Sequence, residues 1–343
     1  MTALYPRYRE LKQQYPDKDV RDLAAMMAIS EAELIAARVG HQVQPLRPAM
    51  AELLHALADV GEICCRTRNA YAQHEQRGCF SNVQIGEHAG IVLNPRALDL
   101  RLFVREWASV FHLHEMTAHG ECRSLQFFDH YGDAVLKVCT TDNSDMNAWQ
   151  QLLTDFHAEA APAFSVKRVP APASPVECDA ERLEEEWRAM TDVHQFFRLL
   201  KKYNVTRLQA FRAVSRDLAE QVNNTSLSAL LERVHQQGNE IMIFVGNRAC
   251  TQIFTGKIET LTAGYPWLNI VSPAFSLRLL QEGIAESWIT RKPTADGIVT
   301  SLELFAADGT QIAQLYGQRS EGQPEQKRWR EQLATVSAED AAV

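Results

Sequence analysis

The segment TDVHQFFRLLKKYN, residues 191–204, brings together side chains that suit ligand binding. An apolar stripe recurs there at helical spacing and consists of Val193, Phe196, Phe197 and Leu200. His194 lies at the edge of this stripe, and a set of cations follows it, namely Arg198, Lys201, Lys202 and Arg207. An imidazole that binds iron, aromatic rings that cover a flat macrocycle and cations that pair with its propionates would together suit haem. The spacing alone favours the other interpretation, a structural histidine with solvated basic neighbours.

A second group of histidines lies in HLHEMTAH, residues 112–119. His112 and His114 have strand spacing, and Glu115 and His119 are near enough in sequence to complete a metal site. The spacing matches no established ligand pattern, so a polar edge strand and turn is the favoured interpretation. The sequence also has no G-x-S-x-G, phosphate-binding loop, dinucleotide glycine fingerprint or H-E-x-x-H. We therefore favour a protein that binds a cofactor-like molecule carrying its own chemistry.

The bulk composition narrows the possible partners and the compartment. A chain of 343 residues is the size of two domains. Its formal net charge of -8 would repel a polyanion, so DNA is not expected as a partner. The N-terminus is charged from Arg7, and no later stretch approaches a membrane-spanning length. Seven cysteines without a CxxC spacing suit reduced thiols. We expect a cytoplasmic protein that is not embedded in a membrane.

The second half of the chain repeats the first. LDLRLF at 98–103 matches FSLRLL at 275–280, and SLQFFDHYGD at 124–133 matches SLELFAADGT at 301–310, both with an offset of 177. Trp149 and Trp329 are matched near the two ends. Prolines in VPAPASPVECD stiffen the connection between the copies. We predict an N-terminal repeat over residues 1–168, a proline-rich linker over 169–179 and a C-terminal repeat over 180–343.

Each copy predicts the same elements in the same order. Helices are expected over 50–61 and 226–238, followed by strand-like runs and an amphipathic closing helix that carries the matched tryptophan. Polar turns that contain glycine divide 124–139 and 301–316 into hairpins. Consecutive hairpins imply antiparallel pairing. The expected class is α+β, a tandem structural duplication in which each half is a large antiparallel β-sheet packed with helices.

Several long motifs resemble those of one known family, the cytoplasmic haemin-degrading and haemin-transport proteins of bacterial haem-uptake systems, of the HemS and ChuS type. The motifs are PDKDVRDLAAMM, NPRALDLRLFVREW, TDVHQFFRLLKKYN, RLQAFRAV, GNRACTQIFTG, NIVSPAFSLRL and QLYGQR. The resemblance covers both repeats and the linker. It implies that one haem lies between the two halves and is degraded oxidatively to release iron. The alternative is a non-catalytic carrier that transfers haem to other proteins.

The resemblance also implies a set of site residues. His194 would be the axial ligand of the haem iron, and Arg101 would approach the distal face and serve the catalytic step. Other cofactor-binding residues would be Phe103, Arg207, Phe244, Lys292, Gln314, Tyr316 and Arg319. Arg278, which matches Arg101 in the second copy, would be structural, and His74 would match an accessory haem ligand of some members. Implied partners are an inner-membrane haem importer and an electron donor, and the protein would be a monomer or a homodimer.

Overall fold

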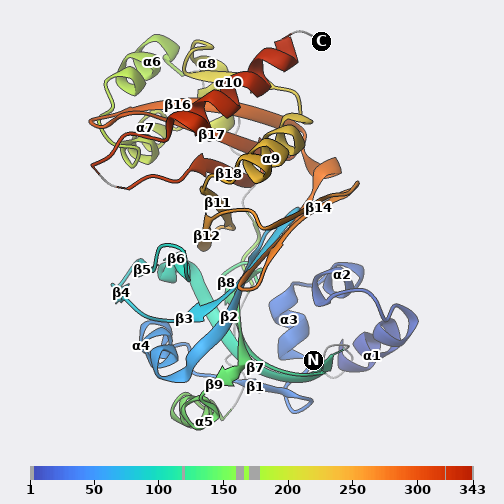
Figure 1. Ribbon diagram of the computed structural model, residues 1–343. Coiled ribbons are helices and arrows are strands. Elements are labelled where there is room, and N and C mark those ends of the chain that lie inside the picture. The colour runs from blue at the N-terminus through green and yellow to red at the C-terminus, as the bar shows by residue number, and fades with distance from the viewer. Residues whose placement is uncertain (1–3, 118–119, 160–165, 170–177, 321, 342–343) are drawn as a thin grey trace. The chain divides into compact units, whose positions relative to one another are not determined.

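A computed structural model describes residues 4–117, 120–159, 166–169, 178–320 and 322–341. The chain forms two compact units (Figure 1). Unit 1 comprises Met1–Arg68, Glu75–Pro170 and Asn247–Gln252, and unit 2 comprises Asn69–His74, Ala171–Gly246 and Ile253–Val343. Residues 170–177 of the predicted linker lie outside the described residues. The two units follow the two repeats except for two short segments. Asn69–His74 of the first repeat belongs to unit 2, and Asn247–Gln252 of the second repeat belongs to unit 1. We call these two the exchanged segments.

The first copy supplies the following elements: α1 (Leu4–Gln14), α2 (Val20–Met26), α3 (Glu31–Ala36), β1 (Val43–Pro45), α4 (Met50–Ala56), η1 (Leu57–Val60), β2 (Gly61–Arg68), β3 (Ala72–Cys79), β4 (Val83–Ile85), β5 (Gly90–Leu93), β6 (Asp99–Leu102), η2 (Val104–Glu106), β7 (Trp107–Thr117), β8 (Gly120–Asp129), β9 (Ala134–Ser144) and α5 (Met146–Asp155). In unit 1 the strands lie in the orders β1-β7-β8-β9-β2-β3 and β6-β5-β4. Residues of α4 and α5 share a core with β2, β8 and β9, while α3 packs with β1 and β7 in a separate cluster. Helices therefore cover both faces of the unit 1 sheet.

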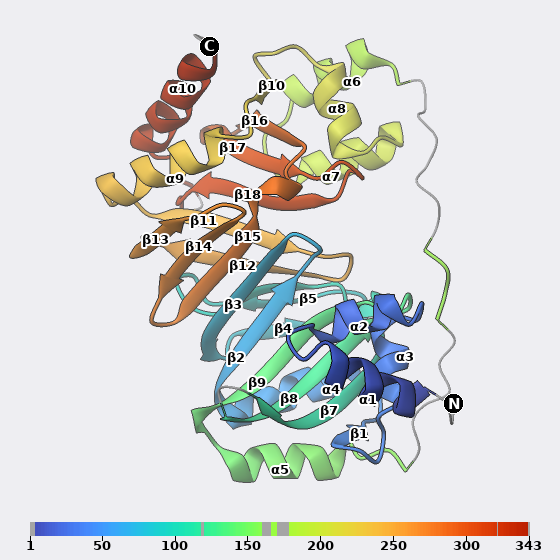
Figure 2. The ribbon, with the colours of Figure 1, turned by 90° about the vertical axis from the view of Figure 1, so that its right-hand side faces the viewer.

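The second copy supplies α6 (Ala180–Arg188), α7 (Gln195–Tyr203), α8 (Arg207–Ala213), β10 (Ala219–Val222), α9 (Ser226–Gln237), β11 (Ile241–Gly246), β12 (Cys250–Gly256), β13 (Thr260–Ala263), β14 (Trp267–Ser272), β15 (Phe275–Leu280), η3 (Gln281–Gly283), β16 (Glu286–Thr294), β17 (Gly297–Phe305), β18 (Gln311–Gly317) and α10 (Lys327–Ala341). Unit 2 has the strand orders β10-β16-β17-β18-β11-β12 and β15-β14-β13. Helices α9 and α10 pack on one face of its sheet, and α6, α7 and α8 form a second core with β16 and β17 (Figure 2). The layers of unit 1 are thus repeated.

The repeat extends to the register of the strands. In the β8–β9 pair Ser124 lies opposite Cys139, and in the β17–β18 pair Ser301 lies opposite Tyr316. Both residues of the second pair follow their counterparts by 177 positions. The strand pairs described within the two units are antiparallel, so the predicted α+β duplication is confirmed.

Matched asparagines organise the two exchanged segments. The side-chain oxygen of Asn69 accepts the N–H groups of two following residues, and that of Asn247 does the same. Their amide nitrogens donate to the carbonyl of Ile312 at 2.9 Å and to that of Val135 at 2.9 Å, respectively. Because buried backbone carbonyls need donors, each asparagine both closes its turn and holds it to the receiving unit.

Candidate functional site

His194 lies immediately before α7, and its side chain is 85% exposed. The helix ends at Tyr203 and is capped by Asn204, whose left-handed backbone (φ 51°) is tolerated by asparagine. Its buried face is formed by Phe196, Leu199 and Leu200, whereas Phe197 is 63% exposed. The predicted stripe was therefore wrong at Phe197: once Phe196 faces the core, the residues three and four positions later share its face and the next residue does not.

The ring of His194 is held by a carboxylate. Its Nδ1 lies 2.7 Å from Asp192 Oδ1, and the same oxygen accepts the backbone N–H of His194 at 2.7 Å. The hydrogen bond from this backbone N–H is the main reason why the pKa of Asp192 lies below its usual value. The carboxyl is therefore ionised and can only accept hydrogen bonds. The proton of a neutral His194 ring is therefore on Nδ1, which leaves the lone pair of Nε2 for a metal ion.

A buried ion cluster lies on the sheet face that α7 and α8 cover. Glu303 is fully buried in β17 and accepts from Arg207 Nη1 at 3.0 Å and from Lys292 Nζ at 2.8 Å. Thr206 forms a capping box with Gln209 and is the N-cap of α8. Arg207 is therefore the first residue of the helix, which fixes its position. Burial alone would raise the pKa of Glu303, but the two cations outweigh it and hold the pKa at about 2. The carboxylate therefore stays ionised.

The cluster continues along β18. Gln311 Nε2 donates to Glu303 at 2.7 Å, Gln314 Nε2 donates to Gln311 at 2.6 Å, and the Tyr316 hydroxyl donates to Gln314 at 2.9 Å. The Phe244 ring of β11 meets Tyr316 edge-on, with centroids 5.2 Å apart. Five residues implied by the resemblance are thus linked to Glu303. Arg207 and Lys292 bind its carboxylate directly, and Gln314, Tyr316 and Phe244 are connected to it through Gln311.

Sequence reasoning missed Glu303 and Gln311. A signal for Glu303 was available in SLELF, where an acidic residue occupies a buried position of an alternating strand. A buried carboxylate needs cationic partners, and Lys292 on the neighbouring strand is one of them. Arg319 follows β18, is half-buried, and its charge acts on both Asp192 and Glu325.

Arg101 and Phe103 belong to unit 1. The guanidinium of Arg101 in β6 donates to the carboxylate of Asp99, which is buried, and Phe103 is 41% exposed. The matched Arg278 of unit 2 instead lies over the Trp267 ring, 4.1 Å from its centroid. The two matched arginines therefore have different partners, one anionic and one aromatic.

Comparisons with known proteins identify the family. The model of the haemin-degrading HemS.ChuX domain matches residues 28–156 and, a second time, residues 204–336. The chain belongs to the haemin-degrading HemS/ChuX family. The hemin transport protein HmuS of Yersinia pestis is 56% identical over 99% of both chains. The heme-degrading enzyme ChuS of Escherichia coli O157:H7 is 57% identical and superposes with a TM-score of 0.92, covering 97% of this chain and 98% of its own. Holo-PhuS, a heme-binding protein from Pseudomonas aeruginosa, is 41% identical with a TM-score of 0.92, covering 96% of this chain and 97% of its own.

The other histidines of this HemS/ChuX-family chain have different surroundings. His74 is fully buried, with its ring edge-on to Phe275 at 4.9 Å. Burial lowers the pKa of His112 to about 4, and His114 pairs with Glu121. His119 lies outside the described residues, and among those described no group of three or more His, Cys, Asp or Glu side chains is arranged to hold a metal ion.

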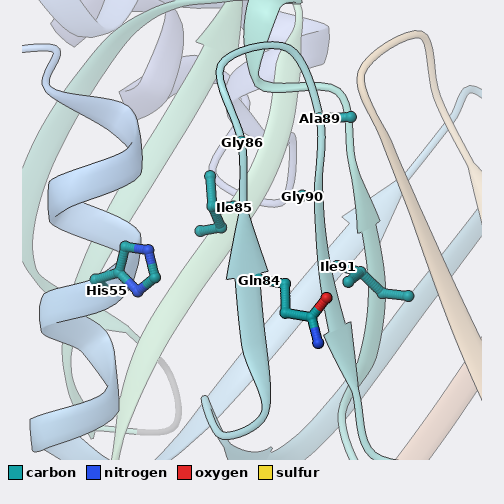
Figure 3. A pocket seen from close by; sticks show the side chains of 7 residues that line it. All are labelled: His55, Gln84, Ile85, Gly86, Ala89, Gly90 and Ile91. Carbon is teal, nitrogen blue, oxygen red and sulfur yellow. The ribbon is translucent and has the colours of Figure 1, made fainter.

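An open pocket in unit 1 is bordered by His55 of α4 and by the β4–β5 hairpin (Figure 3). Its other lining residues are Gln84, Ile85, Gly86, Ala89, Gly90 and Ile91. None of the residues implied by the resemblance borders it. In the part of the chain that the structure describes, no helix is long and apolar enough to cross a membrane.

Proposed function

We propose that this protein binds haem through His194 and degrades it oxidatively, releasing iron. The observation that carries the proposal is the exposed His194 ring, with its Nδ1 engaged by Asp192 at 2.7 Å. A carboxylate in this position fixes the tautomer and orientation of a metal-binding imidazole and raises its basicity. Relatives described as a heme-degrading enzyme and a heme-binding protein support the proposal.

The surroundings of His194 fit the rest of the ligand. Phe197 presents an exposed ring, and the Arg207 guanidinium lies 5.1 Å from its centroid. An apolar ring next to a cation suits a macrocycle that carries carboxylates. Haem supplies an iron that activates dioxygen or peroxide, and the chain has to hold, orient and partly desolvate it.

Arg101 is our proposed catalytic residue on the distal side, as the family resemblance implies. Its guanidinium is oriented by the Asp99 carboxylate, and a fixed cation stabilises negative charge that develops on oxygen. Phe103, Phe244, Lys292, Gln314, Tyr316 and Arg319 remain proposed cofactor-binding residues. An inner-membrane haem importer would deliver the ligand, and an electron donor would supply the reducing equivalents.

A haem titration of His194→Ala tests the ligand. Loss of the nitrogen ligand should weaken binding at least about tenfold and shift the Soret maximum. His88→Ala, which removes an exposed histidine of unit 1, is the control and should bind as the wild type does. A wild-type spectrum and affinity for His194→Ala would refute the assignment.

A turnover assay separates the enzyme from a haem carrier. The haem complex is treated with ascorbate or dilute peroxide, with catalase controls, and the Soret band is followed. Loss of the band with an open-chain tetrapyrrole product supports the enzyme, and slower loss in Arg101→Ala but not Arg278→Ala supports the distal role. An unchanged band with transfer to a second haem protein supports the carrier.

A further inference from the structure

Glu303 gives a direction to a chain of hydrogen bonds that runs from it through Gln311 and Gln314 to Tyr316. An ionised carboxylate only accepts, so the atom of Gln311 that faces it must be the amide nitrogen, as observed at 2.7 Å. The oxygen of Gln311 then faces Gln314 and has to receive an N–H. The oxygen of Gln314 is left to accept the hydroxyl proton of Tyr316. One buried anion therefore orients two amides and one phenol.

The same anion holds the two cations. Glu303 is bonded to Arg207 and Lys292, and Lys292 also donates to Thr290 at 2.6 Å. Lys292 is only 2% exposed. The two cations and one anion leave a single net positive charge, and Arg207 is the more exposed of the two cations. Since Lys292 is more enclosed, we expect Arg207 to be the nearer of the two cations to a ligand carboxylate.

We propose that Glu303 is a positioning residue of the haem site, which fixes the guanidinium of Arg207 and turns the hydroxyl proton of Tyr316 away from the ligand. This inference rests on the proposed function and names a residue that the resemblance did not supply. A bound haem would meet Tyr316 as a hydrogen-bond acceptor. A carboxylate is repelled by an acceptor, so its propionate is directed to Arg207 and the orientation of the macrocycle is restricted.

A double-mutant cycle between Gln311 and Tyr316 tests the chain of hydrogen bonds. Gln311→Met leaves all charges in place but breaks the link between Glu303 and Gln314. We expect about tenfold weaker haem binding, because the phenol is then free to rotate, and Tyr316→Phe should reduce the effect of Gln311→Met to less than about twofold. Gln323→Met, an exposed glutamine of the same unit, is the matched control and should bind normally. Wild-type affinity of Gln311→Met, or additive effects of the two changes, would overturn the proposal.

The role of Glu303 itself is tested in a charge-matched variant. Glu303→Gln alone would leave two cations near each other in a buried place, so it is combined with Lys292→Met, which restores the net charge of the cluster. If only net charge mattered, the double variant would bind haem as the wild type does, which would contradict the proposal. We expect weaker binding of haem and an unchanged affinity for haem dimethyl ester, whose carboxylates are blocked.

A measurement without haem keeps this proposal separable from the proposed function. In the haem-free wild type, NMR signals of the Gln311 and Gln314 side-chain amides should each show one hydrogen-bonded proton, and both should shift in the charge-matched variant. Unshifted signals would refute the positioning role even if haem binds. Shifted signals with no haem binding by the wild type would support the hydrogen-bond chain and refute the proposed function.

Discussion

Replacing Glu325 by glutamine should stabilise the protein strongly at pH 8 and only slightly at pH 5. Glu325 lies in the segment between β18 and α10 and accepts the Thr300 N–H at 2.9 Å and the Thr300 hydroxyl at 2.7 Å. Burial raises its pKa from 4.5 to about 7, although these hydrogen bonds and the charge of Arg330 oppose the shift. The charge of Arg319 also acts to lower the pKa of this carboxyl.

The direction of this pH dependence follows from the protonation of Glu325 in the folded and in the unfolded state. Well below pH 4.5, Glu325 is protonated in both the folded and the unfolded state. Between about pH 4.5 and 7 the unfolded state loses the proton while the folded state keeps it, so the free energy of unfolding falls as the pH rises. Above pH 7 the full penalty is about 3.5 kcal/mol, from 1.4 kcal/mol for each unit of a pKa difference of about 2.5 units. Glutamine resembles the protonated acid and avoids this penalty.

Urea unfolding followed by tryptophan fluorescence at pH 5, 6, 7 and 8 measures the difference. The difference in unfolding free energy between Glu325→Gln and the wild type should be small at pH 5 and grow progressively to pH 8. Glu331→Gln on α10 removes an exposed carboxylate whose partner is Lys327, and it should follow the wild type throughout. A constant offset between Glu325→Gln and the wild type at all four pH values would refute the reasoning.

Two further predictions concern His194 and the thiols of unit 1. Asp192→Ala should weaken haem binding about tenfold, the lower end of the usual range because the pair is exposed, while Asp217→Ala, which removes another exposed carboxylate, should have no effect in the same titration. A hydrogen bond from Cys139 lowers the pKa of Cys122 to about 6, whereas burial raises that of Cys64 to about 12. At pH 7 iodoacetamide should therefore label Cys122 before Cys64 in peptide mapping, and Cys139→Ala should slow the labelling of Cys122; equal rates at both thiols would contradict this.

The duplication was predictable because its signals are local. Matched tryptophans, Trp149 and Trp329, are both almost fully buried, and the hairpins of the two copies keep one offset. Hydrophobic alternation and turn residues specify such elements without knowledge of their partners. The exchanged segments at Asn69 and Asn247 were not predictable, because their role depends on carbonyls far away in the sequence.

Several residues of the cluster around Glu303 were named from the resemblance by type, but their arrangement was not. The resemblance named Arg207 and Lys292 as cations, but their shared partner Glu303 lies 96 and 11 positions away, respectively. The prediction that Phe197 belongs to the buried stripe was wrong for a simpler reason. A stripe read from spacing has no fixed phase until one residue, here Phe196, is known to face the core.

The first copy provides an internal comparison for the cluster around Glu303. Capping boxes begin both α3 and α8, and Ser30 and Thr206 are their N-caps, 176 positions apart. This alignment places Glu31 at the position of Arg207, while the sheet offset of 177 places Glu115 at Lys292 and Gln126 at Glu303. The helix caps and registers recur, but the charges do not.

The opposite charges at matched positions of the two copies indicate which copy can bind an anionic ligand. Two acids in unit 1, Glu31 and Glu115, stand at the positions of the two cations in unit 2, and each is paired with its own arginine, Arg68 or Arg38. A propionate placed on the equivalent face of unit 1 would meet carboxylates and would be repelled. Residues that serve only the fold have reason to be alike in both copies, whereas these differ in sign. This contrast supports our proposal that a haem carboxylate binds the cationic face of the second copy, on the same unit as His194.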